Sequence, residues 1–325
     1  MRIQVVGAGS WGLALARLVA RNGHAVNISC RAEDGPDILR NERRSPHFLP
    51  GVTLPESITI SETADPDCEI AVLAVPSHAM RAVVGRMHFS PDTILVNVAK
   101  GIENDTLLCM HEVIEQTVPG SVVVTLSGPS HAEEVARDLP ASLVAAGRSE
   151  AACEKVQTAF TAKTFRVYTS PDITGVALGG ALKNVIAIAA GVCDGFGLGD
   201  NAKAALITRG LAEMARLGVA LGADPLTFSG LSGMGDLIVT CASQHSRNRA
   251  VGEKIASGKK LEEILASSPM VAEGVRTARA ALALAQKHKV EMPITEQVYR
   301  VLYEGADARE AVVALMTRDA KPERD

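Results

Sequence analysis

The chain has 325 residues, with 33 lysines and arginines against 37 aspartates and glutamates, for a formal net charge of −4 at pH 7. This balance excludes the basic character of a protein that binds nucleic acid, and the length is enough for two domains with a core each. Hydrophobic residues make up 47% of the chain but aromatic residues only 3%, so we expect cores of Ala, Val, Leu and Ile.

Strand-like and helical segments alternate through the first half of the chain. This pattern is typical of a mostly parallel sheet with helices on both faces, so residues 1–170 are predicted to form an α/β, Rossmann-like, doubly wound domain. Residues 44–55 contain three prolines and are predicted to be a loop. The predicted strands are 2–6, 25–30, 70–75, 93–98, 122–126, 141–145 and 165–169, and the predicted helices are 11–21, 78–87, 107–116 and 150–163.

After Pro171 the strand signal stops and helical periodicity dominates. We place the domain boundary at Ser170–Pro171 and predict an all-α second domain over residues 171–325. The predicted helices are 173–192, 202–217, 237–241, 248–256, 261–266, 276–288, 294–303 and 308–316.

The six cysteines occur singly, without a C-x-x-C pair, and the eight histidines lack zinc-like spacing. We therefore expect free thiols in a reducing cytoplasm and no metal ion. Met1 leads directly into the strand-like Ile3-Gln4-Val5-Val6, so no signal peptide is expected.

The segment Gly7-Ala8-Gly9-Ser10-Trp11-Gly12 fits the pattern G-x-G-x-x-G between a predicted strand and a predicted helix. In that context Gly7 permits a tight turn, Gly9 lets a pyrophosphate approach the backbone, and Gly12 lets the helix pack closely on the strand. Free N–H groups at the helix start then face the phosphates. A glycine-rich turn without a ligand is the alternative.

The end of the second predicted strand indicates which nucleotide is bound. NAD-specific sites usually carry Asp or Glu there for the ribose hydroxyl, but this strand ends Ser29-Cys30-Arg31. A guanidinium suits a 2′-phosphate, so we predict NADP(H), with NAD(H) as a poorer substitute. The alternative is a surface arginine, with Glu33 or Asp34 binding the ribose.

Three polar segments follow predicted strands, at the edge where such sheets bind ligands. Ser77 ends the first and is predicted to cap a helix, and Lys100 ends the second. The third, Ser127-Gly128-Pro129-Ser130-His131-Ala132-Glu133, is predicted to contain a capping box of Ser130 with Glu133. Backbone N–H groups near Gly128 and Ser130 remain available for an anion or a substrate oxygen.

Lys183 is the single charged residue between Asp172 and Asp194, in an otherwise mostly apolar run. The run is long enough to cross a membrane, but Lys183, Asn184 and four glycines favour a buried helix instead. Burial lowers the pKa of an ammonium group toward neutrality, where it can exchange protons. A surface lysine with its stem along the core is the alternative.

The helical half carries further candidate site residues. Asp236 and Thr240 lie one helical turn apart and can face one site. In Ser246-Arg247-Asn248-Arg249, Ser246 is predicted to be an N-cap. Free N–H groups and an arginine there suit a phosphate, and a solvated basic patch is the alternative.

Taken in order, these motifs resemble one family, the prokaryotic-type NAD(P)-dependent glycerol-3-phosphate dehydrogenases. The likeness runs almost from end to end, and the ordered set is specific even though single motifs are common. It is carried by GAGSWG at 7–12, VPSH at 75–78, AKG at 99–101, SGPS at 127–130, GGALKNV at 179–185, TRGLAE at 208–213, GMGDL at 233–237, SRNR at 246–249, AEG at 272–274 and EMPI at 291–294.

The resemblance implies that Lys183 is the proton acceptor in glycerol 3-phosphate oxidation. We expect Asn184 and Asp236 to position Lys183 and the substrate hydroxyls. Cys30 is a departure, since relatives often carry a tryptophan near that strand end. The implied substrate contacts are Lys100, Gly128, Ser130, Lys183, Asp236, Ser246, Arg247 and Asn248. Besides the glycines of the loop, the implied cofactor contacts are Ser10, Trp11, Arg31, Lys100, Ala132, Arg247, Val271 and Glu273.

Two other functions fit part of the pattern. A related dehydrogenase of another small keto or hydroxy acid, such as ketopantoate, needs a buried lysine but less of a phosphate site. A module that senses NADP(H) without turnover explains the glycine loop and Arg31, but not Lys183, Asp236 and Arg247 together. The Ala-rich helices suit a homodimer, and the resemblance implies supply of glycerol 3-phosphate for phospholipid synthesis.

Overall fold

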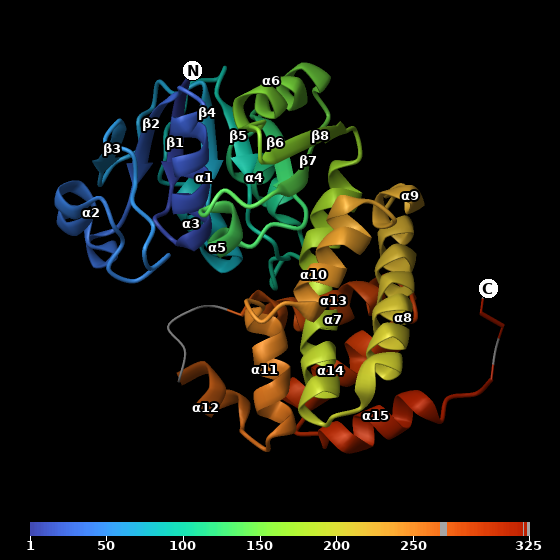
Figure 1. The fold of residues 1–325 in the computed structure, drawn as a ribbon. Coiled ribbons are helices and arrows are strands. Elements are labelled where there is room, and N and C mark those ends of the chain that lie inside the picture. Colours follow the sequence, from blue (N-terminus) through green and yellow to red (C-terminus); the bar gives the residue numbers. More distant parts are fainter. Residues whose placement is uncertain (267–271, 321, 324–325) are drawn as a thin grey trace.

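The computed structural model describes residues 1–266, 272–320 and 322–323. Val271, an expected cofactor contact, lies outside the described residues. Figure 1 shows a sheet with its helices above a bundle of helices, and the chain passes from one to the other between the last strand and helix α7. The predicted fold class, a Rossmann-like sheet followed by helices, is confirmed.

Eight strands form one sheet in the order β3-β2-β1-β4-β5-β6-β7-β8. All neighbouring strands run parallel except β6 and β7, which are antiparallel. The strands are β1 (Arg2–Val6), β2 (Ala25–Ser29), β3 (Ile58–Ser61), β4 (Ile70–Leu73), β5 (Ile94–Asn97), β6 (Val122–Ser127), β7 (Ala141–Gly147) and β8 (Phe165–Ser170).

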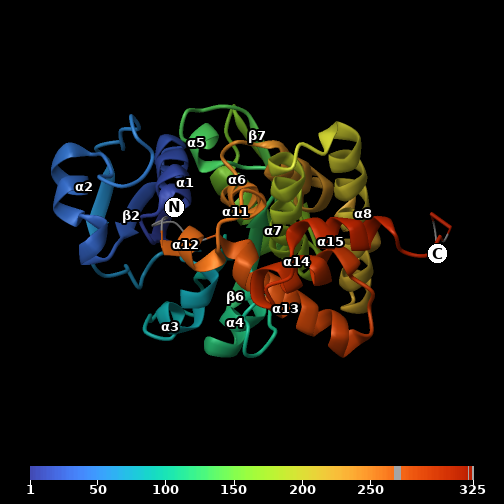
Figure 2. The ribbon, with the colours of Figure 1, turned by 90° about the horizontal axis from the view of Figure 1, so that it is seen from below.

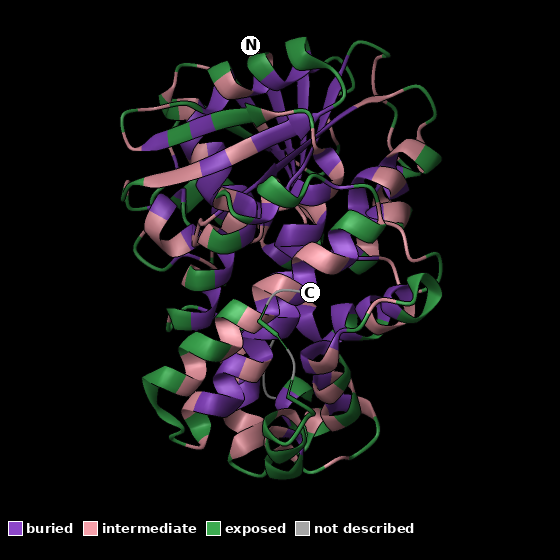
Figure 3. Cartoon of the chain, turned by 90° about the vertical axis from the view of Figure 1, so that its right-hand side faces the viewer, coloured by how far each residue is buried: buried purple, intermediate pink, exposed green. Residues whose placement is uncertain are grey.

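Helices cover both faces of this sheet because successive strand side chains point to opposite faces. Val5 packs in a core with residues of α1 and α6, whereas its neighbour Val6 packs in a second core with α3 and α4. Most of the central strands are buried between these layers (Figure 3). The helices of this half are α1 (Ser10–Arg21), α2 (Pro36–Glu42), α3 (Met80–Val84), α4 (Met110–Thr117), α5 (Ala132–Val135) and α6 (Glu150–Phe160).

The second half surrounds the long helix α7 (Ile173–Gly195), which Figure 2 shows among α8, α11, α13 and α14. A Cβ at Gly191 would lie 1.9 Å from the Arg249 carbonyl oxygen, so glycine lets the backbones of α7 and α11 touch. The other elements are α8 (Gly199–Ala220), α9 (Pro225–Phe228), a π-helical turn (Leu231–Gly235), α10 (Asp236–Ala242), α11 (Arg247–Ala256), α12 (Leu261–Ala266), α13 (Glu273–His288), α14 (Pro293–Tyr303) and α15 (Ala308–Met316).

Within the described chain, α7 alone is long and apolar enough to cross a membrane, and 94% of its most apolar window is buried inside the protein. It is therefore the core helix that the sequence predicts. The structure adds elements that the sequence did not predict, namely β3, α2, α9 and the π-helical turn. The domain boundary at Ser170–Pro171 stays a prediction, and it falls between the end of β8 and the start of α7.

Candidate active site

Lys183 lies on the buried middle of α7, and its side chain is 7% exposed. Its Nζ donates to Asp236 Oδ1 at 2.5 Å and to Thr240 Oγ1 at 2.6 Å. Asp236 and Thr240 both come from α10 and face one point, as their spacing predicts. The alternative of a lysine reaching out into solvent is wrong, because the ammonium group is enclosed by protein.

Lys100 joins the same carboxylate from the sheet half. It follows β5, and its Nζ donates to Asp236 Oδ2 at 2.6 Å and to the Gly128 carbonyl oxygen at 3.1 Å. A Cβ at Gly180 of α7 would lie 2.7 Å from Ser127 Oγ and 3.4 Å from Lys100 Cγ. Glycine at this position therefore lets α7 approach the ends of β5 and β6, so the two lysines meet at one aspartate.

Burial and charge set the proton affinities of this cluster. Burial lowers the pKa of Lys183 most, Asp236 raises it and Lys100 lowers it, and together they bring it down to about 8. For Asp236, burial raises the pKa, but the two lysines outweigh it and hold that pKa below its ordinary value. One carboxylate thus faces two ammonium groups, which leaves an excess positive charge that suits an anionic ligand.

Next to this cluster, Asn184 joins two helices to α7. Its Oδ1 accepts from Asn248 Nδ2 at 2.9 Å, and Asn248 Oδ1 accepts from the Gly274 N–H at 2.9 Å. Asn184 Nδ2 donates to the Gly180 carbonyl oxygen at 3.4 Å. The Asn184 amide thus bonds Asn248 and the Gly180 carbonyl oxygen in the described structure, and its role in positioning Lys183 and the substrate hydroxyls stays a prediction.

Ser246 is the N-cap of α11, as the sequence predicts. Ser246 is buried, and its Oγ accepts from the Arg249 N–H at 3.2 Å. Asn248 is also buried, whereas Arg247 is exposed. Arg249 instead pairs with Asp194 at 2.5 Å, so the two arginines have different surroundings. Arg247 is the one whose guanidinium is open to a ligand.

The glycine-rich loop fits a dinucleotide. Gly7 has a φ of +105°, and a Cβ there would lie 2.5 Å from the Ala74 carbonyl oxygen, while one at Gly12 would lie 2.2 Å from the Gly7 carbonyl oxygen. A Cβ at Gly9 would meet nothing within 4 Å. Gly9 is also the N-cap of α1, whose first turn has no side-chain cap and no acidic residue. The N–H groups after Gly9 therefore face open space that suits pyrophosphate.

At the end of β2, Arg31 is exposed and held by two carboxylates. Its Nη1 lies 2.6 Å from Glu33 Oε1, and its Nη2 lies 3.2 Å from Asp34 Oδ1. Asp34 is buried, and its Oδ2 accepts from the Arg31 N–H at 2.9 Å. Asp34 is therefore occupied in fixing Arg31, while the Arg31 guanidinium and the Glu33 carboxylate are both exposed at this strand end.

Two predicted caps are wrong, and in each case another contact takes the side chain. Ser77 N–H and Oγ donate to Glu273 Oε1 and Oε2, at 3.1 and 2.5 Å, and Pro76 is the N-cap instead. Ser130 Oγ donates to the Gly128 carbonyl oxygen at 2.9 Å, and α5 begins one residue later with His131 as N-cap. The Ser77–Glu273 contact ties α13 to the sheet half and was not predicted.

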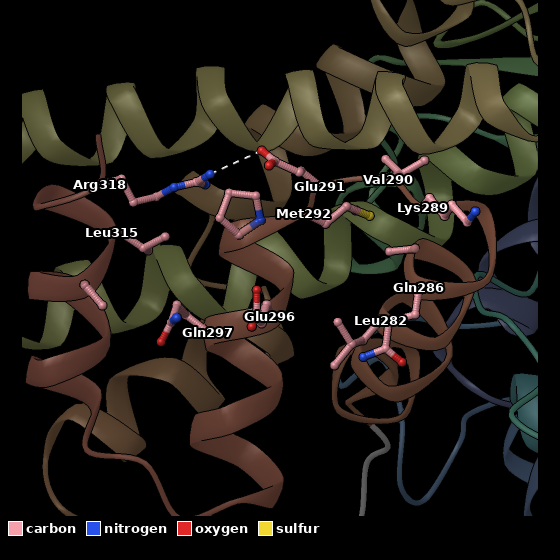
Figure 4. Close-up of a pocket in the computed structure, with 13 residues that line it drawn as sticks. Leu282, Gln286, Lys289, Val290, Glu291, Met292, Glu296, Gln297, Leu315 and Arg318 are labelled. Carbon is pink, nitrogen blue, oxygen red and sulfur yellow. Dashed lines mark hydrogen bonds and ion pairs between the residues drawn. The ribbon is translucent and has the colours of Figure 1, made fainter. Parts of the chain in front are cut away.

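A separate pocket of about 520 Å³ lies between α13, α14 and α15 (Figure 4). Arg318 and Glu291, 3.3 Å apart, form an ion pair within it, and Leu282, Met292 and Leu315 supply apolar walls. It shares no residue with the Lys183 cluster or the glycine-rich loop.

A glycine-rich strand–helix turn, a doubly wound sheet and a buried lysine cluster beneath the sheet define a two-domain protein of the dinucleotide-binding class. Family models described as the NAD-dependent glycerol-3-phosphate dehydrogenase N-terminus and C-terminus match residues 2–153 and 172–313. The chain belongs to this family, as its motifs predict.

Relatives and solved structures agree with this assignment. The chain is 51% identical to "Glycerol-3-phosphate dehydrogenase [NAD(P)+]" of Pelotomaculum thermopropionicum, over 98% of this chain and 93% of that one. It is also 51% identical to the protein of the same name from Thermoanaerobacter sp. (strain X514), over 99% of each. A crystal structure of glycerol-3-phosphate dehydrogenase from Coxiella burnetii superposes with a TM-score of 0.93 at 36% identity, over 98% of this chain and 99% of that one.

The ketopantoate-type alternative is similar only in fold. The crystal structure of 2-dehydropantoate 2-reductase from Methylococcus capsulatus has a TM-score of 0.57 at 16% identity, although it covers 98% of this chain and 99% of that one.

Proposed function

We propose that this protein is a glycerol-3-phosphate dehydrogenase that transfers a hydride reversibly between NAD(P)H and dihydroxyacetone phosphate. The observation that carries the proposal is the enclosed Lys183–Asp236–Lys100 cluster, at the place where the cofactor half meets the helical half. Family membership and the names of relatives about half identical to this chain support the substrate.

When bound, the nicotinamide ring supplies the hydride that reaches the ketone carbon. Lys183 Nζ holds a proton and donates it to the oxygen of that carbonyl as negative charge develops there, and it takes the proton back in the reverse direction. Asp236 and Thr240 fix the ammonium group in place. Such general acid–base assistance is worth roughly two to four powers of ten in rate.

The remaining site residues bind and orient the substrate in this proposal. Ser246, Arg247 and Asn248 hold the phosphate at the start of α11, where free N–H groups favour an anion. Lys100, Gly128 and Ser130 contact the three-carbon unit from the sheet half. The cluster carries one more positive charge than negative, and this supports the choice of a phosphorylated substrate.

The cofactor is held by the glycine-rich loop with Ser10 and Trp11, and by Lys100, Ala132, Arg247 and Glu273 at the nicotinamide side. Arg31 binds a 2′-phosphate, so NADP(H) is preferred over NAD(H). The engagement of the Asp34 carboxylate by Arg31 supports this preference, because an acid that binds a ribose hydroxyl needs a free oxygen.

We expect Arg31→Gln to raise the KM for NADPH by roughly 10- to 100-fold and to change the KM for NADH by less than about threefold. A charge-assisted bidentate contact is lost only for the phosphorylated cofactor. Steady-state kinetics with both cofactors measure this. Arg148→Gln is the matched control, because Arg148 is a similarly exposed arginine in another part of the sheet half. Equal losses for both cofactors, or a wild-type preference for NADH, contradict the assignment.

One spectrophotometric assay tests the activity itself. The loss of NADPH absorbance is followed with dihydroxyacetone phosphate, with ketopantoate, and without a ketone. Rapid loss with dihydroxyacetone phosphate alone is the expected result. Turnover of ketopantoate instead supports the other dehydrogenase, and cofactor binding without any turnover supports a redox-sensing module.

In the cell, we place this enzyme in the cytoplasm as a homodimer that supplies glycerol 3-phosphate for phospholipid synthesis. The alanine-rich helices and the exposed Val313 and Met316 of α15 favour contact between copies. Sedimentation of the purified protein at micromolar concentration measures the subunit number.

A further inference from the structure

His131 is a partly buried residue for which the proposed reaction has no role. It is the N-cap of α5, directly after the SGPS motif, and its Nε2 is sealed from solvent without a hydrogen-bond partner among the described residues. Buried polar atoms of folded proteins are nearly always paired, so an unpaired imidazole nitrogen needs an explanation. A ligand that supplies the missing partner is one.

The position of the ring favours a ligand at this point. The imidazole packs against His245 with 5.7 Å between ring centroids. His245 stands directly before Ser246, Arg247 and Asn248, the proposed phosphate-binding residues at the start of α11. His131 of the sheet half therefore contacts the residue that directly precedes the phosphate-binding segment of the helical half.

Burial and nearby charges together hold the pKa of His131 below its ordinary value in the free protein. Burial lowers its pKa first, Lys183 of α7 and Lys100 after β5 lower it further, and Glu133 and Glu134 of its own helix oppose them. A bound phosphate dianion adds negative charge beside the ring, and an opposite charge at that range raises the pKa of a histidine.

We propose that His131 is a substrate-binding residue that donates a hydrogen bond from Nε2 to the substrate phosphate and takes up a proton as the phosphate binds. This inference rests on the proposed function, since it requires a phosphorylated substrate. It assigns a contact from the sheet half to a phosphate otherwise held by residues of the helical half. His131 then helps to distinguish dihydroxyacetone phosphate from ketones without a phosphate.

Kinetics of three variants test the contact. His131→Phe is expected to raise the KM for dihydroxyacetone phosphate by roughly 10- to 100-fold, because a hydrogen bond to a charged group is lost. Its kcat is expected to change less than about threefold. His131→Gln places an amide donor near the position of Nε2 and is expected to recover part of the KM. His288→Gln, at an exposed histidine ending α13, is the control and leaves KM unchanged.

Histidine side-chain NMR tests the proton uptake directly. With ring-labelled histidine, the signal missing in His131→Gln identifies His131, and its titration is recorded with and without glycerol 3-phosphate. The expected result is a clear upward shift of the His131 pKa on binding, with no shift at His288. The same titration at a saturating concentration of glycerol, which lacks the phosphate, is expected to leave the His131 pKa unchanged.

The outcomes separate this inference from the proposed function. Suppose that the wild type turns over dihydroxyacetone phosphate. If both His131 variants then keep the wild-type KM, or if the His131 pKa does not change when glycerol 3-phosphate binds, the inference is overturned and the function stands. If the wild type neither binds glycerol 3-phosphate nor reduces dihydroxyacetone phosphate, both are overturned. Thermal unfolding of His131→Phe close to that of the wild type shows that a raised KM reports the contact.

Discussion

Lys183→Met is expected to lower kcat by roughly two to four orders of magnitude while the affinity for NADPH stays close to that of the wild type. Methionine fills much of the same space and has no proton to give, so the carbonyl oxygen loses both its positive neighbour and its acid. Lys183 is enclosed against Asp236 and Thr240, and neither of these hydrogen-bond partners belongs to the glycine-rich loop. Steady-state assays and fluorescence titration with NADPH measure the two effects.

Two comparisons make this prediction specific. Lys287→Met, at an exposed lysine near the end of α13, leaves kcat unchanged. Lys100→Met removes the rival ammonium group and is expected to raise KM while keeping the basic limb of the pH–rate profile, the fall in the rate of ketone reduction at high pH. Near-normal turnover of Lys183→Met contradicts the proton-carrying role, and loss of that limb in Lys100→Met alone transfers the role to Lys100.

Asp236→Asn is expected to lower the free energy of unfolding by about 3–5 kcal/mol, because removing one partner of a buried ion pair leaves charge without compensation. Here two ammonium groups lose their shared carboxylate at once. Asp236 also raises the pKa of Lys183 against burial, so its loss moves that pKa further down. Urea unfolding measures the first effect, and the pH dependence of turnover measures the second.

Asp92→Asn is the matched control for stability, because Asp92 is exposed in the loop before β5. Its unfolding free energy is expected to stay within about 0.5 kcal/mol of the wild type. An Asp236→Asn protein as stable as the control, with an unmoved pH profile, shows that the carboxylate does not compensate the two lysines.

Local patterns were sufficient to predict most of the fold. The glycine-rich loop and the apolar run of α7 are recognisable from their residue types alone. Helices α1 and α7 lie where these two patterns predict them. Strand β3 alternates apolar and polar residues over only four positions after a proline-rich loop, whereas the equally short β4 and β5 are almost continuous apolar runs that stand out in the sequence. The antiparallel pairing of β6 with β7 depends on non-local hydrogen bonds, which residue spacing within one strand does not encode.

The site was predictable in its members but not in its contacts. Lys100 and Asp236 are 136 residues apart, and Ser77 and Glu273 are 196 apart, so only the packing of the two halves reveals these pairs. The cap predicted for Ser130 failed for a local reason. Its hydroxyl bonds the carbonyl of Gly128, whose φ of +150° bends the chain before the helix begins.

The pH dependence of kcat/KM in both directions tests the central claim most directly. Burial lowers the pKa of Lys183 to about 8. Ketone reduction needs the protonated amine and is expected to fall as pH rises through that value, whereas glycerol 3-phosphate oxidation needs the free amine and is expected to rise through it. We predict that kcat/KM changes in opposite directions with pH for the two reactions, with both changes centred near pH 8. We predict that the residual activity of Lys183→Met shows neither change. Flat profiles in that range, or an inflection that survives in Lys183→Met, contradict the account.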